Sequence, residues 1–518
     1  MAEQVLRGIP RALLVDGWWL TMADEAAPQS PPKGPIGGTQ RFTQLNTRFG
    51  LLVLLVIFAD FLFYSQWVGL SLALFGAVLA AVVLLLADGQ DPRGGVVALI
   101  GFALLPVVEQ VQLLSLLFWI AGLLMAVVWA VLGRAPAWGA GCLTATRFFL
   151  RLPGFAAFDL SRGIYRSTTS GQIAGRAGAM LRGWAMPAVV GLVFAALIIA
   201  ANPVLEGWLN TLTTLTDPPV TLVVRVLFWA MMAMLIWPFL RLAQQRAGFA
   251  KPTTLAHIFI PPQPVWFGMN PASVANALGL FNLIFALQTA MDLTCLWCGA
   301  DLPDGLSHAQ YAHRGAYPLV ATALLAGVFA LISRPYTEGQ PRLRRLLALW
   351  LGQNILLVIS SLYRLDLYVE SYGLTYLRIA AAIWMGLVAM GLMLTAWQIW
   401  RGKTNLWLMQ RNALMLLAVL YACCFVNFAA VIAHSNLERF AADELDRAYI
   451  CSLGPNAAAE ITAYRAQMGT QLCHNSSLQG PQVDGWRDWG FRSWRVQRNL
   501  VAVRVQAVRR SIGENSGR

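Results

Sequence analysis

The chain has 518 residues, of which 58% are hydrophobic and only 12% are charged, and its formal net charge is +13. Soluble domains carry about 25% charged residues, so the composition excludes an ordinary soluble protein. The apolar residues form runs long enough to cross about 30 Å of hydrocarbon as helices. A transmembrane barrel is excluded as well, because its strands would alternate apolar and polar residues.

We therefore predict an all-α, polytopic helical membrane protein in three parts. Residues 1–49 form a cytoplasmic, partly disordered N-terminal tail, residues 50–433 form the transmembrane helical domain, and residues 434–518 form a small helical extracytoplasmic tail. The positive charges flank hydrophobic segments, as the positive-inside rule describes, rather than forming a nucleic-acid surface. The expected partner is the lipid bilayer, and no nucleic acid is expected.

In chain order, the hydrophobic pattern predicts about eleven membrane spans. The third is short and contains Pro106, which predicts a tilted or re-entrant segment. The predicted spans are Leu51–Trp67, Val68–Ala87, Val96–Val108, Leu113–Leu132, Trp184–Val204, Val220–Leu240, Val274–Leu296, Ala316–Ile332, Leu346–Leu362, Ile379–Trp400 and Ala413–Ala433.

The basic residues predict the orientation of these spans. With a cytoplasmic N-terminus, the short outer loops contain only Arg314, Arg364 and Arg378, whereas the inner loops contain most of the arginines. This predicts an odd number of spans and a periplasmic C-terminus. The arginines of the C-terminal tail do not oppose this orientation, because long segments cross the membrane largely regardless of charge.

Residues 142–183 are predicted to form a cytoplasmic segment that does not span the membrane. Its arginines alternate with phenylalanines and lie one helical turn apart, as Arg147 with Arg151 and Arg162 with Arg166. One interpretation is an interfacial helix whose arginines contact anionic lipid headgroups. The other is an ordinary cytoplasmic helical hairpin.

The stretch Tyr363–Arg378 is charged and rich in tyrosine, and it lies between two apolar runs. Because charges are costly in hydrocarbon, we predict a loop at the membrane surface. Gly373 would allow a tight turn, and Thr375 would cap the helix that follows. Three tyrosines recur every fourth residue and would form an aromatic belt or a ligand platform: Tyr368, Tyr372 and Tyr376.

The predicted orientation places nearly every costly polar residue at the outer membrane surface. We expect one polar cluster open to the periplasm, because intramembrane ionisable groups usually pair and mark functional sites. The alternative is that each group reaches the headgroups or forms a structural pair. The candidate residues are Asp60, Glu109, Asp292 and Glu370, which would face Arg225, Arg314 and Arg378, together with Asp366, Tyr372 and Asn427.

Four of the seven cysteines fall on the predicted outer side, where disulfides persist. A bridge between Cys451 and Cys473 would link two parts of the small tail. Cys295 and Cys298 end an apolar run without the context of a thioredoxin-like site. No two histidines have the spacing of metal ligands on a helix, so we predict no metal site. Phosphate-loop and hydrolase motifs are absent, and we predict no cofactor.

The end of the tail interleaves tryptophan with arginine, as in the run Trp486–Arg495. Tryptophan prefers the depth of the lipid headgroups. We therefore predict either an interfacial segment on the outer leaflet or a segment that packs onto the membrane domain.

Several strings in the second half of the chain form a recognisable pattern in their order and spacing. They are Asp301–Ser307, Tyr311–Leu319, Tyr368, Tyr372–Arg378, Asn427, His434–Arg439, Asp446–Tyr449, Leu453–Pro455 and Trp486–Trp489. This pattern resembles two bacterial inner-membrane protein families, the domain-of-unknown-function families 4173 and 4153. The resemblance covers Val274 to about Arg498, with a looser match in the first spans. It implies a polytopic protein of the bacterial inner membrane and implies no reaction.

These observations favour a non-enzymatic membrane protein with a sensing, scaffolding or accessory role in the envelope. A transporter of a small solute or lipid is the first alternative, since Asn282, Gln353 and Asn354 lie within predicted spans. A membrane enzyme acting on a lipid-linked substrate is the second, with Asp366 and Glu370 as its carboxylates.

Overall fold

The computed structural model describes residues 38–86, 93–132, 218–242, 270–294, 324–333, 339–474 and 479–516, together with a few single positions between them. Within these ranges every regular element is a helix, which confirms the predicted all-α class. The predicted span Trp184–Val204 lies outside the described residues. So do the four arginines proposed to contact anionic lipid, Arg147, Arg151, Arg162 and Arg166.

The first bundle packs five helices around an apolar core. Its centre contains Leu62, Leu79, Val83 and Leu240, which are buried residues from three different helices. The helices are α2 (Gly38–Phe63), α3 (Leu70–Leu86), α4 (Arg93–Glu109), α5 (Leu113–Leu132) and α9 (Pro218–Leu242).

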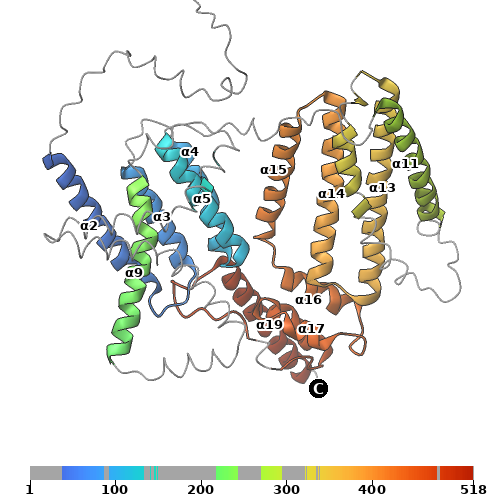
Figure 1. Cartoon of the computed structure of the whole chain (residues 1–518). Coiled ribbons are helices and arrows are strands. Elements are labelled where there is room, and N and C mark those ends of the chain that lie inside the picture. Colours follow the sequence, from blue (N-terminus) through green and yellow to red (C-terminus); the bar gives the residue numbers. More distant parts are fainter. Residues whose placement is uncertain are drawn as a thin grey trace, which may run out of the picture.

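The second bundle is a row of four long helices that stand side by side in Figure 1. Along α13 seven of the buried residues recur at alternating intervals of four and three, the seam of a coiled-coil-like contact. They are Leu343, Leu347, Trp350, Asn354, Leu357, Ser361 and Arg364, and Leu351, Val358, Ser360 and Val369 are buried as well. The helices are α11 (Pro271–Asp292), α13 (Pro341–Tyr372), α14 (Tyr376–Arg401) and α15 (Asn405–Cys423).

Six helices in the described part of the chain are long and apolar enough to cross a membrane. They are α5, α9, α11, α13, α14 and α15. Three shorter apolar helices accompany them at Leu70–Leu86, Gly94–Glu109 and Leu324–Ser333. These helices agree with an integral membrane protein, while the predicted count of about eleven spans stays a prediction.

Two predicted boundaries are wrong. The stretch Tyr363–Arg378 is not a surface loop, because α13 continues to Tyr372 and α14 begins at Tyr376. Between Gly352 and Gly373, α13 contains no glycine or proline, and a buried ion pair accommodates the charge of Arg364.

The predicted span Ala413–Ala433 is two helices rather than one. The first of the two, α15, begins earlier in the sequence than the predicted span, because Thr404 caps its N-terminus, and it ends at Cys423. Helix α16 then begins at Phe428, after the side chain of Asn427 accepts a hydrogen bond from Ala430 N–H. An asparagine that caps a new helix competes with continuation of the old one, which explains the break.

The chain after this break folds into a cap, defined as residues 428–474 and 479–516. Figure 1 shows its helices beneath the ends of both bundles. Ile432, Leu437, Ile450, Ile461 and Tyr464 form its own buried core. The cap contains α16 (Phe428–Arg439), α17 (Arg447–Ser452), the short 3₁₀ helix η4 (Pro455–Ala457), α18 (Ala458–Met468) and α19 (Phe491–Ser516).

Candidate functional site

Five of the predicted site residues that the structure describes lie at or near the ends of helices. Asp60 is in the last turn of α2, while Glu109 and Asp292 are the final residues of α4 and α11. Arg225 is near the start of α9, and Asn427 directly precedes α16. These residues come from five different elements, of which α2, α4 and the segment at Asn427 contact the cap.

The buried carboxylate of Glu109 is held by two arginines of α19. Arg492 donates from Nε to Oε1 at 3.2 Å, and Arg495 donates from Nη2 to the same oxygen. The side chains of Glu109 and Arg492 are only 6% and 5% exposed. Because Glu109 ends α4, where the helix dipole disfavours a carboxylate, these cations stabilise it in place.

Arg492 also reaches the second bundle. Its Nη2 donates to the backbone carbonyl of Cys424, the residue that caps the C-terminus of α15. Carbonyls at this position lack a partner within the helix, and a cation there is favoured by the helix dipole. One side chain of the cap thus bonds to both bundles.

The bundles also touch directly near the cap. The ring of Tyr421 on α15 stacks on Phe102 of α4 at a centroid distance of 3.9 Å. The Tyr421 hydroxyl donates to the backbone carbonyl of Phe102 at 2.8 Å. Phe118 of α5 meets the same tyrosine edge-on at 5.2 Å. Arg492 therefore reinforces an aromatic contact between the two bundles.

The segment before α19 caps the N-terminus of α3. The backbone N–H of Leu70 donates to the Trp489 carbonyl at 2.8 Å, and Ser71 N–H donates to the Arg487 carbonyl at 3.1 Å. These are two of the amide groups that a helix start leaves unpaired. A Cβ at Gly69 would overlap the Asp488 backbone, so this approach requires glycine. The predicted packing of the Trp–Arg segment onto the membrane domain is confirmed.

Asp292 and Arg364 form a buried ion pair between α11 and α13. Arg364 donates from Nη2 to Asp292 Oδ1, and the side chains are 3% and 1% exposed, respectively. Gln288 donates to the same oxygen at 2.9 Å. The pairing offsets the cost of removing both charges from water. Arg364 was expected in an outer loop and instead lies inside the second bundle.

Asp60 and Arg225 form the ion pair that joins α2 to α9. Arg225 donates from Nε to Asp60 Oδ1 at 3.0 Å, and Trp229 donates to the same oxygen at 2.8 Å. The guanidinium lies 4.9 Å from the ring centre of Tyr64 and is 46% exposed. The predicted cluster thus contains separate pairs on different helices, and a shared function for them stays a prediction.

The turn between α13 and α14 is fixed by the cap. Gly373 has a φ of 77°, a left-handed conformation that favours glycine, and the Thr375 side chain caps α14 as predicted. Asn436 of α16 accepts from Leu374 N–H at 2.6 Å and donates to the Leu374 carbonyl at 2.9 Å. Arg378 donates to the backbone carbonyls at the end of α13. This turn therefore connects the second bundle to the cap.

Of the tyrosines expected on one helical face, Tyr368 and Tyr372 lie on α13 with ring centres 4.8 Å apart. Tyr376 begins the next helix, so it does not continue that face. Asp366 and Glu370 are exposed on α13.

Two further candidates complete the set. Asn427 caps α16 and donates to the backbone carbonyl of Asn456 at 3.0 Å. Arg314 lies outside the described residues.

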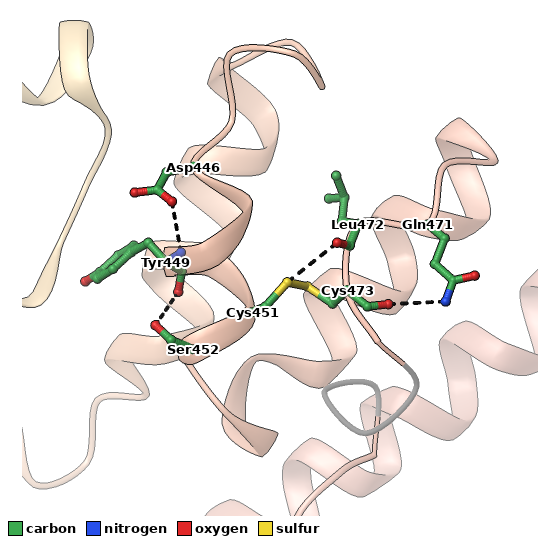
Figure 2. Close-up of a disulfide and its surroundings, with 7 residues drawn as sticks. All are labelled: Asp446, Tyr449, Cys451, Ser452, Gln471, Leu472 and Cys473. Atoms are coloured by element: carbon green, nitrogen blue, oxygen red, sulfur yellow. Dashed lines mark hydrogen bonds between the residues drawn. A yellow bond between two sulfur atoms is a disulfide. The ribbon is translucent and has the colours of Figure 1, made fainter.

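The predicted disulfide between Cys451 and Cys473 is present in the cap. Figure 2 shows that it joins α17 to the segment after α18. The two Cα atoms are 5.6 Å apart, and the sequence separation is 22 residues. In α17 the Asp446 carboxylate accepts from Tyr449 N–H at 3.0 Å and so caps the helix. The bridge holds the two ends of the α17–α18 unit together.

A comparison with protein families finds one match, to the domain of unknown function DUF4153, over residues 49–464. The chain belongs to the DUF4153 family. No curated protein and no solved structure matches it. The DUF4153 match includes both bundles and the cap as far as α18, whereas α19 follows its end.

Sequence reasoning missed two contacts of this DUF4153 chain, that of Arg492 and Arg495 with Glu109 and that of Asn436 with the turn at Leu374. Arg492 and Arg495 are three residues apart, a spacing that places both on one face of α19. That spacing could have indicated a paired contact, but not which carboxylate it meets. Asn436 occurs within a string already singled out for its resemblance to the family, yet its partner is a backbone turn 62 residues away.

The buried carboxylates of the described chain take part in ion pairs between helices. Glu109 and Asp292 are the buried carboxylates of the described chain, and each is paired with arginine. No three of its histidine, cysteine, aspartate and glutamate side chains, within the described ranges, lie close enough together to hold a metal ion. These charged groups of the DUF4153 protein link helices to one another and to the cap.

Proposed function

We propose that this DUF4153 protein is a non-enzymatic protein of the bacterial inner membrane that senses or scaffolds an envelope process through its cap. The observation that carries this proposal is Arg492, which binds Glu109 at the end of the first bundle and the Cys424 carbonyl at the end of the second. Any rotation of one bundle against the other changes the distance that this side chain must bridge. The cap is therefore coupled to the relative position of the bundles.

The proposed orientation has a cytoplasmic N-terminus and a periplasmic cap. The distribution of basic residues supports it, because the inner loops contain most of them. The Cys451–Cys473 disulfide is consistent with the same side, since disulfides persist in the oxidising periplasm. A partner in the periplasm would then meet the cap.

The orientation has a direct test. Alkaline phosphatase fused after Arg518 is active only outside the cytoplasm, and a fluorescent protein that fails to mature there gives the complementary signal. We expect phosphatase activity and no fluorescence. The reverse pattern would place the cap in the cytoplasm and contradict the proposed site of action.

The coupling role is tested by complementation. A deletion strain is screened for sensitivity to detergents, osmotic shock and cell-wall antibiotics, and the wild-type gene is returned together with Arg492→Met. A matched control is Arg498→Gln, which alters another arginine of α19 that lies over the Trp494 ring at 5.4 Å. We expect Arg492→Met to accumulate in the membrane but fail to complement. Full complementation by Arg492→Met would exclude a functional role for the contact.

A transporter is the second candidate, and buried amides support it. The side chain of Asn354 is fully buried in α13, and its Nδ2 donates to the Trp350 carbonyl at 2.8 Å. Its Oδ1, like that of Asn282 on α11, accepts no hydrogen bond from the described part of the chain. Polar groups within spans mark substrate paths in many transporters.

The accessibility of residue 354 to an aqueous reagent distinguishes a transporter from a scaffold, and the experiment does not require a known substrate. In a background without other free thiols, Asn354→Cys is treated with a membrane-impermeant maleimide in right-side-out and in inverted vesicles. A transporter exposes such a position to both sides in turn, so labelling would occur in both preparations. We expect labelling in neither, as for a structural amide within a packed interface.

A further inference from the structure

Arg487 differs from Arg492 and Arg495, the two cap arginines that pair with Glu109, because no carboxylate of the described chain pairs with it. Within the described chain, no carboxylate forms an ion pair with its guanidinium, and its Nε is buried without a hydrogen bond. The neighbouring carboxylate of Asp488 is occupied by the backbone N–H groups of Asp484 and Gly485, at 2.6 and 2.8 Å. Arg487 is therefore a cation with free capacity for an anion.

Two aromatic rings hold this guanidinium in place. It lies 4.3 Å from the ring centre of Phe61 and 5.5 Å from that of Trp486. The two rings are themselves 6.3 Å apart. The backbone of Arg487 is anchored as well, because its carbonyl accepts from Ser71 N–H. The cation is thus positioned before any ligand arrives, which lowers the entropic cost of binding.

The position of Arg487 corresponds to the depth of lipid headgroups. Phe61 is in the last turn of the apolar helix α2, and the start of α3 follows within ten residues. Tryptophan and tyrosine gather at this depth in membrane proteins. Trp67 and Trp486 are strongly exposed here, and the positive end of the α3 dipole adds to the potential.

An apolar surface leads from this cation along α2. Leu54, Ile57 and Phe61 are 63%, 60% and 53% exposed, and their spacing of three and four residues puts them on one helical face. An acyl chain lying on this face would bring its headgroup to Arg487. The planar guanidinium fork matches the geometry of a phosphate group.

We propose that Arg487, Phe61 and Trp486 form a binding site for the phosphate of an anionic phospholipid in the cap-side leaflet, with its acyl chain on α2. This lipid site is separate from the contact on which the proposed function rests, because Arg492 binds Glu109. A guanidinium near a membrane surface contributes about 1 kcal/mol to the attraction of anionic lipid, which corresponds to roughly a fivefold change in affinity.

Native mass spectrometry of the detergent-purified protein tests this site. Phosphatidylglycerol and phosphatidylcholine with identical acyl chains are titrated in parallel, and bound lipid is counted. We expect wild type to prefer phosphatidylglycerol, Arg487→Gln to lose that preference roughly fivefold, and Arg498→Gln to keep it. Arg498 is the matched control because it also lies over a tryptophan ring of the cap, whereas Arg487 lies over Phe61 of α2 as well.

Three results would overturn the proposal. Equal binding of the two lipids by wild type does so without any variant, even where Arg487→Gln fails to fold. An unchanged preference in a folded Arg487→Gln protein does so as well. Finally, glycerol 3-phosphate or inorganic phosphate that displaces phosphatidylglycerol at millimolar concentration would identify a soluble phosphate, not a lipid, as the ligand.

Discussion

Replacing Arg492 by methionine is the sharpest perturbation of this structure, because one side chain contacts both bundles. The substitution keeps an unbranched stem, loses the guanidinium group, and removes its hydrogen bonds to Glu109 and to the Cys424 carbonyl. Breaking a buried ion pair costs about 3–5 kcal/mol, because the remaining charge is buried without its partner. Arg495 still pairs with Glu109, so the lower end of this range applies.

The lost bond to the Cys424 carbonyl adds about 1 kcal/mol, so we expect Arg492→Met to lower the free energy of unfolding by about 3–4 kcal/mol in total. Equilibrium unfolding in mixed micelles, with increasing dodecyl sulfate and detection by circular dichroism, measures this loss. A double-mutant cycle with Glu109→Gln isolates the pair and should give a coupling energy of at least about 1 kcal/mol.

The control is Arg498→Gln, for which we expect a change below about 0.5 kcal/mol because that side chain is exposed. A coupling energy for Arg492 and Glu109 within about 0.3 kcal/mol of zero would refute the interaction, since independent sites add to that accuracy. The interaction would also be refuted if Arg492→Met lowered the free energy of unfolding no more than the control Arg498→Gln does.

Three further predictions concern the other contacts between elements. Asp292→Asn leaves Arg364 charged in a buried site, so we expect a loss of about 3–5 kcal/mol in the same assay. Asn436→Ala removes both partners of the Leu374 backbone, with an expected loss of about 2 kcal/mol. Cys451→Ser removes the disulfide that joins residues 22 positions apart, and the chain-entropy relation gives a loss of stability of about 3 kcal/mol.

Each of these predictions has its own control. Replacing Asp292 and Arg364 together by leucine and methionine should restore most of the stability, because an apolar pair carries no desolvation cost. Asn436→Asp keeps the acceptor for Leu374 N–H and should lose less than the alanine variant. Dithiothreitol should destabilise the wild type but not Cys451→Ser; an equal effect on both would show that the reductant acts elsewhere.

The sequence was sufficient for the helical membrane class. Composition and hydrophobic runs determine that class, because each charge in hydrocarbon is costly. Local signals were equally readable: Thr375 caps α14, and Gly373 supplies the left-handed turn before it. Such features depend on neighbours within a few residues and on no other part of the fold.

The partners of the charged side chains were decided by the tertiary structure. Asp60 meets Arg225, one of the three arginines expected to face the carboxylates, but Asp292 meets Arg364, and Glu109 meets an arginine 383 residues away. A span can rotate about its axis without any change in its hydropathy, so depth alone does not choose which arginine a carboxylate contacts. The packing of the two bundles and the return of the tail fix those rotations. The hydrophobic pattern placed polar residues near the ends of predicted spans, and only the fold determined that Arg492 would join Glu109 to the end of α15.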